Sequence, residues 1–302
     1  MTELWLKNNK LIPEKEWIKS IDNLSSELIV KNKKLAKEQL RELLVQAVKK
    51  RIPNHRFGVF FSGGVDSSLI ASLCKRSKRD FVCYAVGFQD QDTKEPEDIT
   101  EAKKVAKELG LKLKYKIYTL KEAEIIIKKV IRTLKPVGKT DVVNVGVGAV
   151  VLAARELGKK EDYFLGGLGS EEIFAGYERH NLKGSSFEEG DQINEECWRG
   201  LREMWSRDLV RDFNLAQKSK IAVGTPFLDE ELIKYAMQLP GKWKLSKKEK
   251  KIILREVAEE FLGEFAWRKK KAAQYGSCFD KAISKLARKN GFKLKKDWLG
   301  SL

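Results

Sequence analysis

The sequence predicts an α/β fold, a parallel sheet with helices on both faces, followed by a mainly helical C-terminal part. Between residues 57 and 165, short apolar runs typical of buried strands alternate with segments of helical spacing. Two of these runs end in glycine-rich loops, SGGVDSS and GGLGSEE. From about residue 191 onward no convincing strand pattern appears. Because ligands of open α/β sheets bind at the carboxyl ends of the strands, we expect both loops to belong to one site.

The elements before the first glycine loop predict a helical lead-in over residues 1–55. Leu40, Leu43, Leu44 and Ala47 fall on one face of a helix within residues 35–50. Pro53 ends that helix, and the first strand follows at residues 57–61.

The alternating part continues with a helix at 67–75, a strand at 81–88 and a helix at 96–109 that has proline in its first turn. A strand at 112–118 leads into Thr119-Leu-Lys-Glu122, the pattern of a capping box, so we expect a helix from there to about residue 134. The remaining elements that we expect are a helix at 145–157, a strand at 163–165 and helices at 194–212, 230–237, 246–261 (capped by Ser246 and Glu249) and 279–289.

The loop SGGVDSS has the composition of a phosphate cradle. Gly63 and Gly64 permit a sharp turn and a close approach of ligand to backbone, and the helix that follows points free N–H groups at that ligand. The Walker pattern needs a Lys-Ser/Thr after its second glycine, whereas Val65-Asp66 stands here. A polar turn that happens to contain glycines is the alternative. SGGVDSS resembles the PP-loop of ATP pyrophosphatases, in which a carboxylate such as Asp66 holds the magnesium of the departing pyrophosphate.

The second glycine loop makes the resemblance more specific. YFLGGLGSEEIFAGY, residues 163–177, places Glu171 and Glu172 at a helix start, where simple capping is the alternative to a magnesium contact. With SGGVDSS it resembles the SGG-x-DSS and SGEGSDE-[LI]-F-x-GY motifs of asparagine synthetases. TPFLDEELIKYAMQLP is similar to that family's VPFLD segment, and AWRKKKAAQYGS to its W-R-x-K stretch. The order and spacing agree over roughly residues 35–290.

This resemblance implies an adenine nucleotide alpha hydrolase-like (PP-loop) fold and a set of site residues. It divides the chain into the lead-in, a PP-loop ATP-binding core over residues 56–190 and a C-terminal part over 191–302 that completes the active site. Asp66 and Glu171 would hold Mg²⁺, and Lys270 would neutralise charge at the reacting centre, with Asp66 also counted as catalytic. The positions that would hold ATP are Phe61, Ser62, Gly63, Gly64, Asp66, Ser67, Val86, Gly166 and Gly167.

Three departures from the family pattern bear on the reaction. The chain starts Met-Thr and has no room for the glutaminase domain, so ammonia is expected to come free or from a separate glutaminase subunit. Leu168 stands where the family has the glutamate linked to the aspartyl-adenylate step, and an apolar side chain cannot act as a base. Ala222-Val223-Gly224 replaces the family's E-A-R and removes a charged pair.

Composition excludes several classes of protein. The four cysteines show no C-x-x-C spacing and the chain has only two histidines, which argues against disulfides, zinc and histidine metal clusters. We expect a soluble cytoplasmic protein with no membrane contact, because no signal core or apolar span is present.

Residues 241–302 hold 18 basic and 7 acidic residues, a net charge of +11. We favour a solvated surface plus a few ATP-directed lysines over an RNA surface.

The expected function is therefore that of an asparagine-synthetase-like, AMP-forming carbon–nitrogen ligase of amino-acid biosynthesis. It would use ATP and Mg²⁺ to adenylate a small carboxylate and then form an amide with ammonia or an amine. One alternative is a PP-loop enzyme that adenylates a tRNA base, which the basic C-terminal part favours. Another is an ATP-binding relative without catalysis, against which the retained Asp66 and acidic pair argue.

Overall fold

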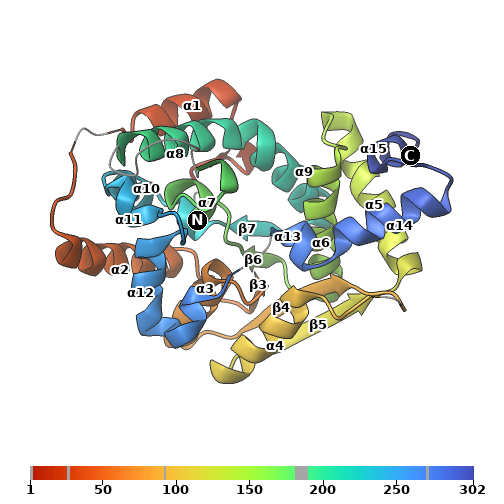
Figure 1. The fold of residues 1–302 in the computed structure, drawn as a ribbon, viewed down its shortest axis with the longest axis horizontal. Helices are drawn as coiled ribbons and strands as arrows, with labels where there is room; N and C mark the ends of the chain where they lie inside the picture. The colour runs from red at the N-terminus through yellow and green to blue at the C-terminus, as the bar shows by residue number, and fades with distance from the viewer. Residues whose placement is uncertain (1–2, 26–27, 92, 181–189, 270–271) are drawn as a thin grey trace.

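The structure is a computed structural model that describes residues 3–25, 28–91, 93–180, 190–269 and 272–302. Its centre is a parallel sheet of five strands in the order β5-β4-β3-β6-β7 (Figure 1). The strands are β3 Phe57–Phe60, β4 Phe81–Phe88, β5 Leu113–Tyr118, β6 Tyr163–Leu165 and β7 Ala222–Gly224. The predicted parallel α/β sheet is confirmed.

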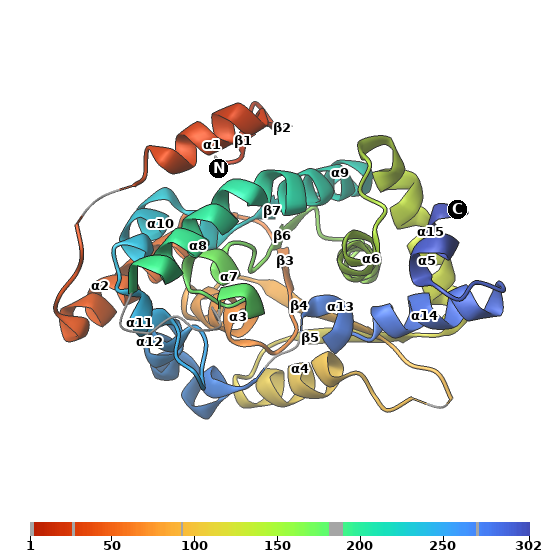
Figure 2. The same ribbon diagram turned by 45° about the horizontal axis from the view of Figure 1, so that its top comes forward.

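Helices cover both faces of this sheet. The connections β3–α3–β4 and β4–α4–β5 run toward one edge, through α3 Val65–Arg76 and α4 Glu97–Glu108. The chain then returns to β6 on the other face, through α5 Leu120–Leu134 and α6 Val142–Leu157. In Figure 2, α4 and α6 lie on opposite sides of β4 and β5. All eight residues of β4 are buried, as expected for a central strand covered on both sides.

The direction of strand order reverses between β3 and β6, which pair directly through Gly58–Phe164 and Val59–Leu165. Such a reversal opens a crevice at the carboxyl ends of the two strands, where ligands of these folds bind. The loops that follow β3 and β6 are the two glycine loops of the sequence. The topology therefore brings the two loops together.

The C-terminal half is mainly helical, but it contributes a strand that the sequence analysis missed. β7 lies at the sheet edge beside β6, with Leu165 opposite Gly224. The expectation of no strand after residue 191 is therefore wrong. Three residues that include a glycine are too few to show an alternating pattern. Gly224 is required there, because a Cβ would overlap the Tyr163 hydroxyl.

The helices of this half begin with α8 Gly190–Met204, a π-helical segment Trp205–Leu209 and α9 Val210–Ser219. They continue with α10 Glu230–Met237, α11 Gly241–Lys244, α12 Ile252–Leu262, α13 Ala273–Gly276, α14 Phe279–Lys289 and α15 Lys295–Gly300. The predicted helix at 246–261 starts too early. Ser246 Oγ accepts the N–H groups of Lys248 and Glu249 in a turn, and α12 begins only at residue 252.

The lead-in contains more than helices. A hairpin of β1 Leu6–Lys7 and β2 Lys10–Leu11 precedes α1 Glu14–Asp22 and α2 Lys33–Lys49. In both ribbon views α1 lies along α8 (Figures 1 and 2), and the Trp17 indole N–H donates to the Leu201 carbonyl at 2.8 Å. Among the described helices, none is long and apolar enough to cross a membrane.

Candidate active site

The first glycine loop is shaped to receive a ligand at the start of α3. Gly63 has a φ of +68°, and a Cβ there would lie 2.8 Å from the Glu101 backbone, so only glycine fits. Ser67 Oγ donates to the Gly64 carbonyl at 3.2 Å and accepts the Ser62 N–H at 3.3 Å. Gly64 is the N-cap, and within the described residues no side chain caps α3. The first N–H groups of the helix can therefore bind phosphate oxygens.

The first glycine loop leaves the sheet where β3 ends. The Phe61 N–H donates to the Tyr84 carbonyl at 2.9 Å, and the pairing of β3 with β4 stops at Phe60–Tyr84. Backbone groups alternate between the two sides of a strand, so those of Val86 face the same side as Tyr84, beyond the end of β3. Phe88, two residues further on, donates its N–H on that side to the Ser277 carbonyl at 2.8 Å. The Val86 backbone groups therefore face the region beyond the end of β3, on the side where the first glycine loop begins.

The second glycine loop touches the first. The Gly166 N–H donates to the Gly224 carbonyl at 3.0 Å, which anchors the loop to β7. A Cβ on Gly167 would lie 3.1 Å from Cβ of Asp66, so the backbone of one loop packs against the side chain of the other. Ser170 Oγ donates to Asp66 Oδ1 at 2.5 Å. The residues predicted from the two motifs thus converge at one place.

Lys251 joins the two loops and was not predicted from the sequence. Its Nζ donates to both Asp66 carboxylate oxygens, at 2.9 and 2.8 Å, and to Ser170 Oγ at 3.0 Å. It also pairs with Glu171 Oε1 at 2.9 Å. Lys251 is 4% exposed and precedes α12 with a φ of +56°, an uncommon conformation for lysine. Nothing in the local sequence KKEKK distinguishes it from Lys247, Lys248 and Lys250.

The charge of Lys251 is set by its two carboxylate partners. Burial disfavours the ammonium form, but Asp66 and then Glu171 more than offset this, so the pKa of Lys251 is raised. The lysine therefore stays protonated between the two loops. Gly176 makes room for the group, because a Cβ there would overlap the Glu171 carboxylate and Lys251 Cε. The glycine of AGY in the second motif thus has a steric role here.

The segment around residue 268 reaches the first loop from the C-terminal part. Arg268 Nη1 donates to the Ser62 carbonyl at 3.1 Å, and its Nε lies 3.3 Å from Glu101. Arg255 donates to the Ala266 carbonyl at 2.6 Å and holds this segment against α12. Lys270, the lysine predicted to neutralise charge, lies outside the described residues. Arg268 is the basic side chain of this segment that the structure places at the loop.

A cluster of buried charges lies behind the second loop. Glu172 accepts a hydrogen bond from Arg207, whose Nε donates to Asp208 at 2.7 Å. Burial, followed by the nearby Asp208 charge, raises the pKa of Glu172 to about 7 despite Arg207. Arg211 extends the cluster to Asp212 at 2.7 Å. Unlike Glu171, Glu172 faces this cluster, so the two adjacent carboxylates have different roles.

Leu168 is partly buried and packs against the main apolar core. The next residue, Gly169, has a φ of +97° and would meet the Leu228 side chain if it carried a Cβ. Leu228 belongs to the PFLD segment, and Asp229 of the same segment accepts from Arg51 Nη1 at 2.9 Å. The PFLD segment therefore packs directly against the second loop at Gly169. The second glycine loop therefore carries an apolar side chain at position 168.

Comparison with known proteins gives a family for this arrangement. The family model described as asparagine synthase matches residues 39–189 and 182–296. A Methanocaldococcus jannaschii protein named "Putative asparagine synthetase (glutamine-hydrolyzing) 1" is 31% identical over 98% of this chain and 62% of its own length. The human asparagine synthetase (glutamine-hydrolyzing) is 32% identical over 80% of this chain and 43% of its own length. The chain thus spans about two fifths to three fifths of the length of these relatives.

The likeness to a solved structure is distant. The U34-tRNA thiolase NcsA from Methanococcus maripaludis is 14% identical and covers 88% of this chain and 81% of its own, with a TM-score of 0.38. A superposition this loose supports no inference about function.

Proposed function

Because the chain belongs to the asparagine synthase family, we propose that it is an AMP-forming ligase that activates a carboxylate with ATP and forms an amide with ammonia or an amine. The observation that carries the proposal is the meeting of Asp66 and Glu171 at one buried ammonium group, Lys251. The two acids come from loops on neighbouring strands, at the reversal of the sheet. A site of this kind suits a reaction in which negative charge moves between phosphate oxygens.

The first loop would bind the triphosphate. Ser62, Gly63, Gly64 and Ser67 form the turn at the start of α3, whose N–H groups and dipole favour phosphate. Phe61 and the Val86 backbone would contact the adenosine. Gly166 and Gly167 would contact ATP from the second loop. No Walker lysine is present, so the departing group is proposed to be pyrophosphate.

The residues present fit a magnesium ion. Asp66 and Glu171 each place a carboxylate oxygen within 2.9 Å of the Lys251 ammonium group, so the two carboxylates lie close enough to share one cation. Mg²⁺ in phosphate-transfer sites commonly uses one or two carboxylates plus substrate phosphates. When bound, Mg²⁺ would stabilise negative charge on the leaving pyrophosphate. Lys251 would supply a fixed positive charge beside the same oxygens. Its four oxygen partners, on three residues, hold it in place, so little reorganisation is needed during the reaction.

The proposed reaction has two steps. A carboxylate oxygen of the substrate attacks the α-phosphorus of ATP. The bond from that phosphorus to the oxygen bridging to the β-phosphate breaks, so pyrophosphate departs and an acyl-adenylate is formed. The nitrogen of ammonia or an amine then attacks the acyl carbon, loses a proton, and AMP departs with the bonding electron pair. Lys251 would offset charge at the phosphates, and Lys270 would offset charge on the tetrahedral intermediate. We propose that Leu168 disfavours the formation of asparagine from aspartate and ammonia, since it offers no base.

Pyrophosphate–ATP isotope exchange tests the adenylation step directly. The exchange should require Mg²⁺ and a specific carboxylate, found by scanning amino acids and dicarboxylic acids, and AMP should be the nucleotide product. Asp66→Asn should abolish exchange, because it removes a negative charge with almost no change in volume. Asp162→Asn is the matched control, since the Asp162 side chain is 74% exposed and precedes β6, whereas the glycine loops follow the strands.

The outcome decides between three functions. ADP and orthophosphate as the only products would contradict the proposal. ATP binding without exchange for any carboxylate would favour the non-catalytic relative. Release of AMP that depends on added tRNA would favour the enzyme that adenylates a tRNA base, for which the net charge of +11 over residues 241–302 is the supporting observation.

A further inference from the structure

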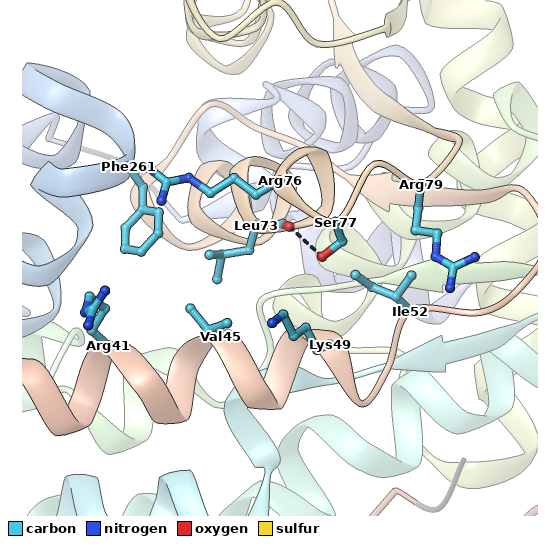
Figure 3. A pocket seen from close by; sticks show the side chains of 9 residues that line it. All are labelled: Arg41, Val45, Lys49, Ile52, Leu73, Arg76, Ser77, Arg79 and Phe261. Atoms are coloured by element: carbon cyan, nitrogen blue, oxygen red, sulfur yellow. Dashed lines mark hydrogen bonds between the residues drawn. The ribbon is translucent and has the colours of Figure 1, made fainter.

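A cavity lies at the opposite end of α3 from the first glycine loop. It has a volume of about 550 Å³ and is formed by α2, the C-terminal end of α3 and the end of α12 (Figure 3). Four basic side chains surround it: Arg41, Lys49, Arg76 and Arg79. No acidic residue of the described chain lines it. We call this cavity the cationic pocket.

The positive charge of the cationic pocket is only partly balanced. Arg41 is 3.3 Å from Glu42 and 3.7 Å from Glu260, and these are its acidic partners. Within the part of the chain that the structure describes, Lys49 and Arg79 have no ion pair or hydrogen bond from their side chains. Four like charges around one cavity repel one another, and an anion placed among them would relieve that repulsion.

The floor of the cationic pocket is apolar. Leu73 and Phe261 are buried, and Val45 and Ile52 are half-buried beside them. The Arg76 guanidinium carbon lies 4.4 Å above the centre of the Phe261 ring, and its Nη2 donates to the Glu260 carbonyl at 3.4 Å. This arginine is therefore held with its planar group at the cavity rim. A solvated basic surface does not need such a floor.

We propose that the cationic pocket binds a small phosphorylated organic molecule. Its phosphate would lie among Lys49, Arg76 and Arg79, because guanidinium groups pair with phosphate oxygens through two parallel hydrogen bonds. Its apolar or aromatic part would cover Val45, Ile52 and Leu73. The volume lies within the ordinary range for small-molecule sites, whereas a nucleic-acid backbone is bound along an extended surface.

The site is separate from the ATP site. The twelve residues of α3 span about 18 Å at the ordinary rise of an α-helix, and the ATP loop and the cationic pocket lie at its two ends. A ligand of the pocket should therefore bind at the same time as ATP. The inference does not depend on the proposed reaction, because none of its residues belongs to the two glycine loops.

The test uses 1-naphthyl phosphate, which combines a phosphate with an apolar ring, on the full chain with α,β-methylene-ATP and Mg²⁺ present to occupy the ATP site. Calorimetry should show one saturable site, and the affinity should fall as salt rises. The Lys49→Ala/Arg79→Ala variant should lose affinity at least tenfold. Lys218→Ala/Lys289→Ala, which removes two exposed cations elsewhere, should bind as the unmodified protein does. Inorganic phosphate and 1-naphthol alone should each bind more weakly.

Three results would overturn the proposal. The first is displacement of the probe by α,β-methylene-ATP, which would place it in the ATP site. The second is unchanged binding in Lys49→Ala/Arg79→Ala, with circular dichroism showing an intact fold. The third is displacement of the probe by total tRNA, together with weaker binding of tRNA by Lys49→Ala/Arg79→Ala than by the unmodified protein. That result would make the pocket part of a nucleic-acid surface.

Discussion

Lys251 Nζ lies 2.8 Å from Oδ2 of Asp66, although the two residues are 185 positions apart in the chain. The contact links the start of α12 to the loop after β3, and Glu171 from the loop after β6 completes it. Lys251 adopts a left-handed backbone conformation to reach this position. Such strain in a buried charged residue is typical of functional sites. We infer that the fold keeps a positive charge where the phosphates of ATP are proposed to lie.

Replacement of Lys251 tests this inference. Lys251→Met should lower the rate of pyrophosphate–ATP exchange by about 10² to 10³, because it removes a fixed charge from the proposed reacting centre. Lys251→Arg should recover only part of the rate, since its planar group does not match the four oxygen partners of the lysine.

Lys250→Met is the control for this prediction. Lys250 is the neighbouring residue, and its side chain pairs with Glu178 rather than with the loops. Exchange by this variant should match that of the unmodified protein. Equal rates for Lys251→Met and Lys250→Met would show that the buried lysine has no part in adenylation.

The apolar side chain at position 168 leads us to expect that aspartate and ammonia are poor substrates. The unmodified protein should make little asparagine from aspartate, ATP and ammonia, because an apolar side chain at this position can neither accept a proton nor hold an ammonium group. Leu168→Glu should raise asparagine formation, whereas Leu168→Gln, of similar size but uncharged, should not. The product is measured by mass spectrometry with labelled ammonia. Robust asparagine formation by the unmodified protein would refute this interpretation of the position.

The buried imidazole of His180 leads us to expect that the free energy of unfolding depends on pH. Its Nδ1 accepts the Tyr177 N–H at 3.0 Å, and burial, followed by Arg179 and Lys244, lowers its pKa to about 3. Below pH 6.5 the unfolded chain therefore binds a proton that the folded protein does not. This part of the stability is present above pH 6.5 and is lost as the pH falls, by on the order of 2 kcal/mol between pH 7 and pH 5.

Urea unfolding at pH 7 and pH 5 measures this effect. His180→Gln should lose less stability over that interval than the unmodified protein. His55→Gln is the control, because it removes the other histidine, whose side chain is 58% exposed. Equal losses in all three proteins would show that the buried ring does not titrate as expected.

The basic C-terminal part predicts weak, salt-sensitive binding of RNA. If the +11 charge of residues 241–302 serves solvation and the ATP site, total tRNA should bind without preference and dissociate steeply as salt rises. AMP release is measured with and without total tRNA at two salt concentrations. A flat response supports the amide-forming ligase. A tRNA-dependent burst that persists at the higher salt would overturn it.

The sequence alone determined the elements whose pattern is local. The strand at Phe81–Phe88 and the helices Glu230–Met237 and Phe279–Lys289 have the predicted bounds, because period and propensity are carried within each segment. The capping box of Thr119 and Glu122 is present for the same reason. The two glycine motifs were likewise recognised because their turns and helix starts are encoded in a few adjacent residues.

Only the tertiary structure decided which distant residues share the site. The short strand β7 forms because β6 offers it an edge, not because three residues have a pattern of their own. The helix α12 starts late because the residues before it turn and send Lys251 between the two loops. Four lysines in KKEKK are equivalent in sequence, and the pairing of one of them with Asp66 and Glu171 depends on long-range packing of α12 against α3. Contacts between segments far apart in the chain leave no local periodicity, so a single sequence could not reveal them.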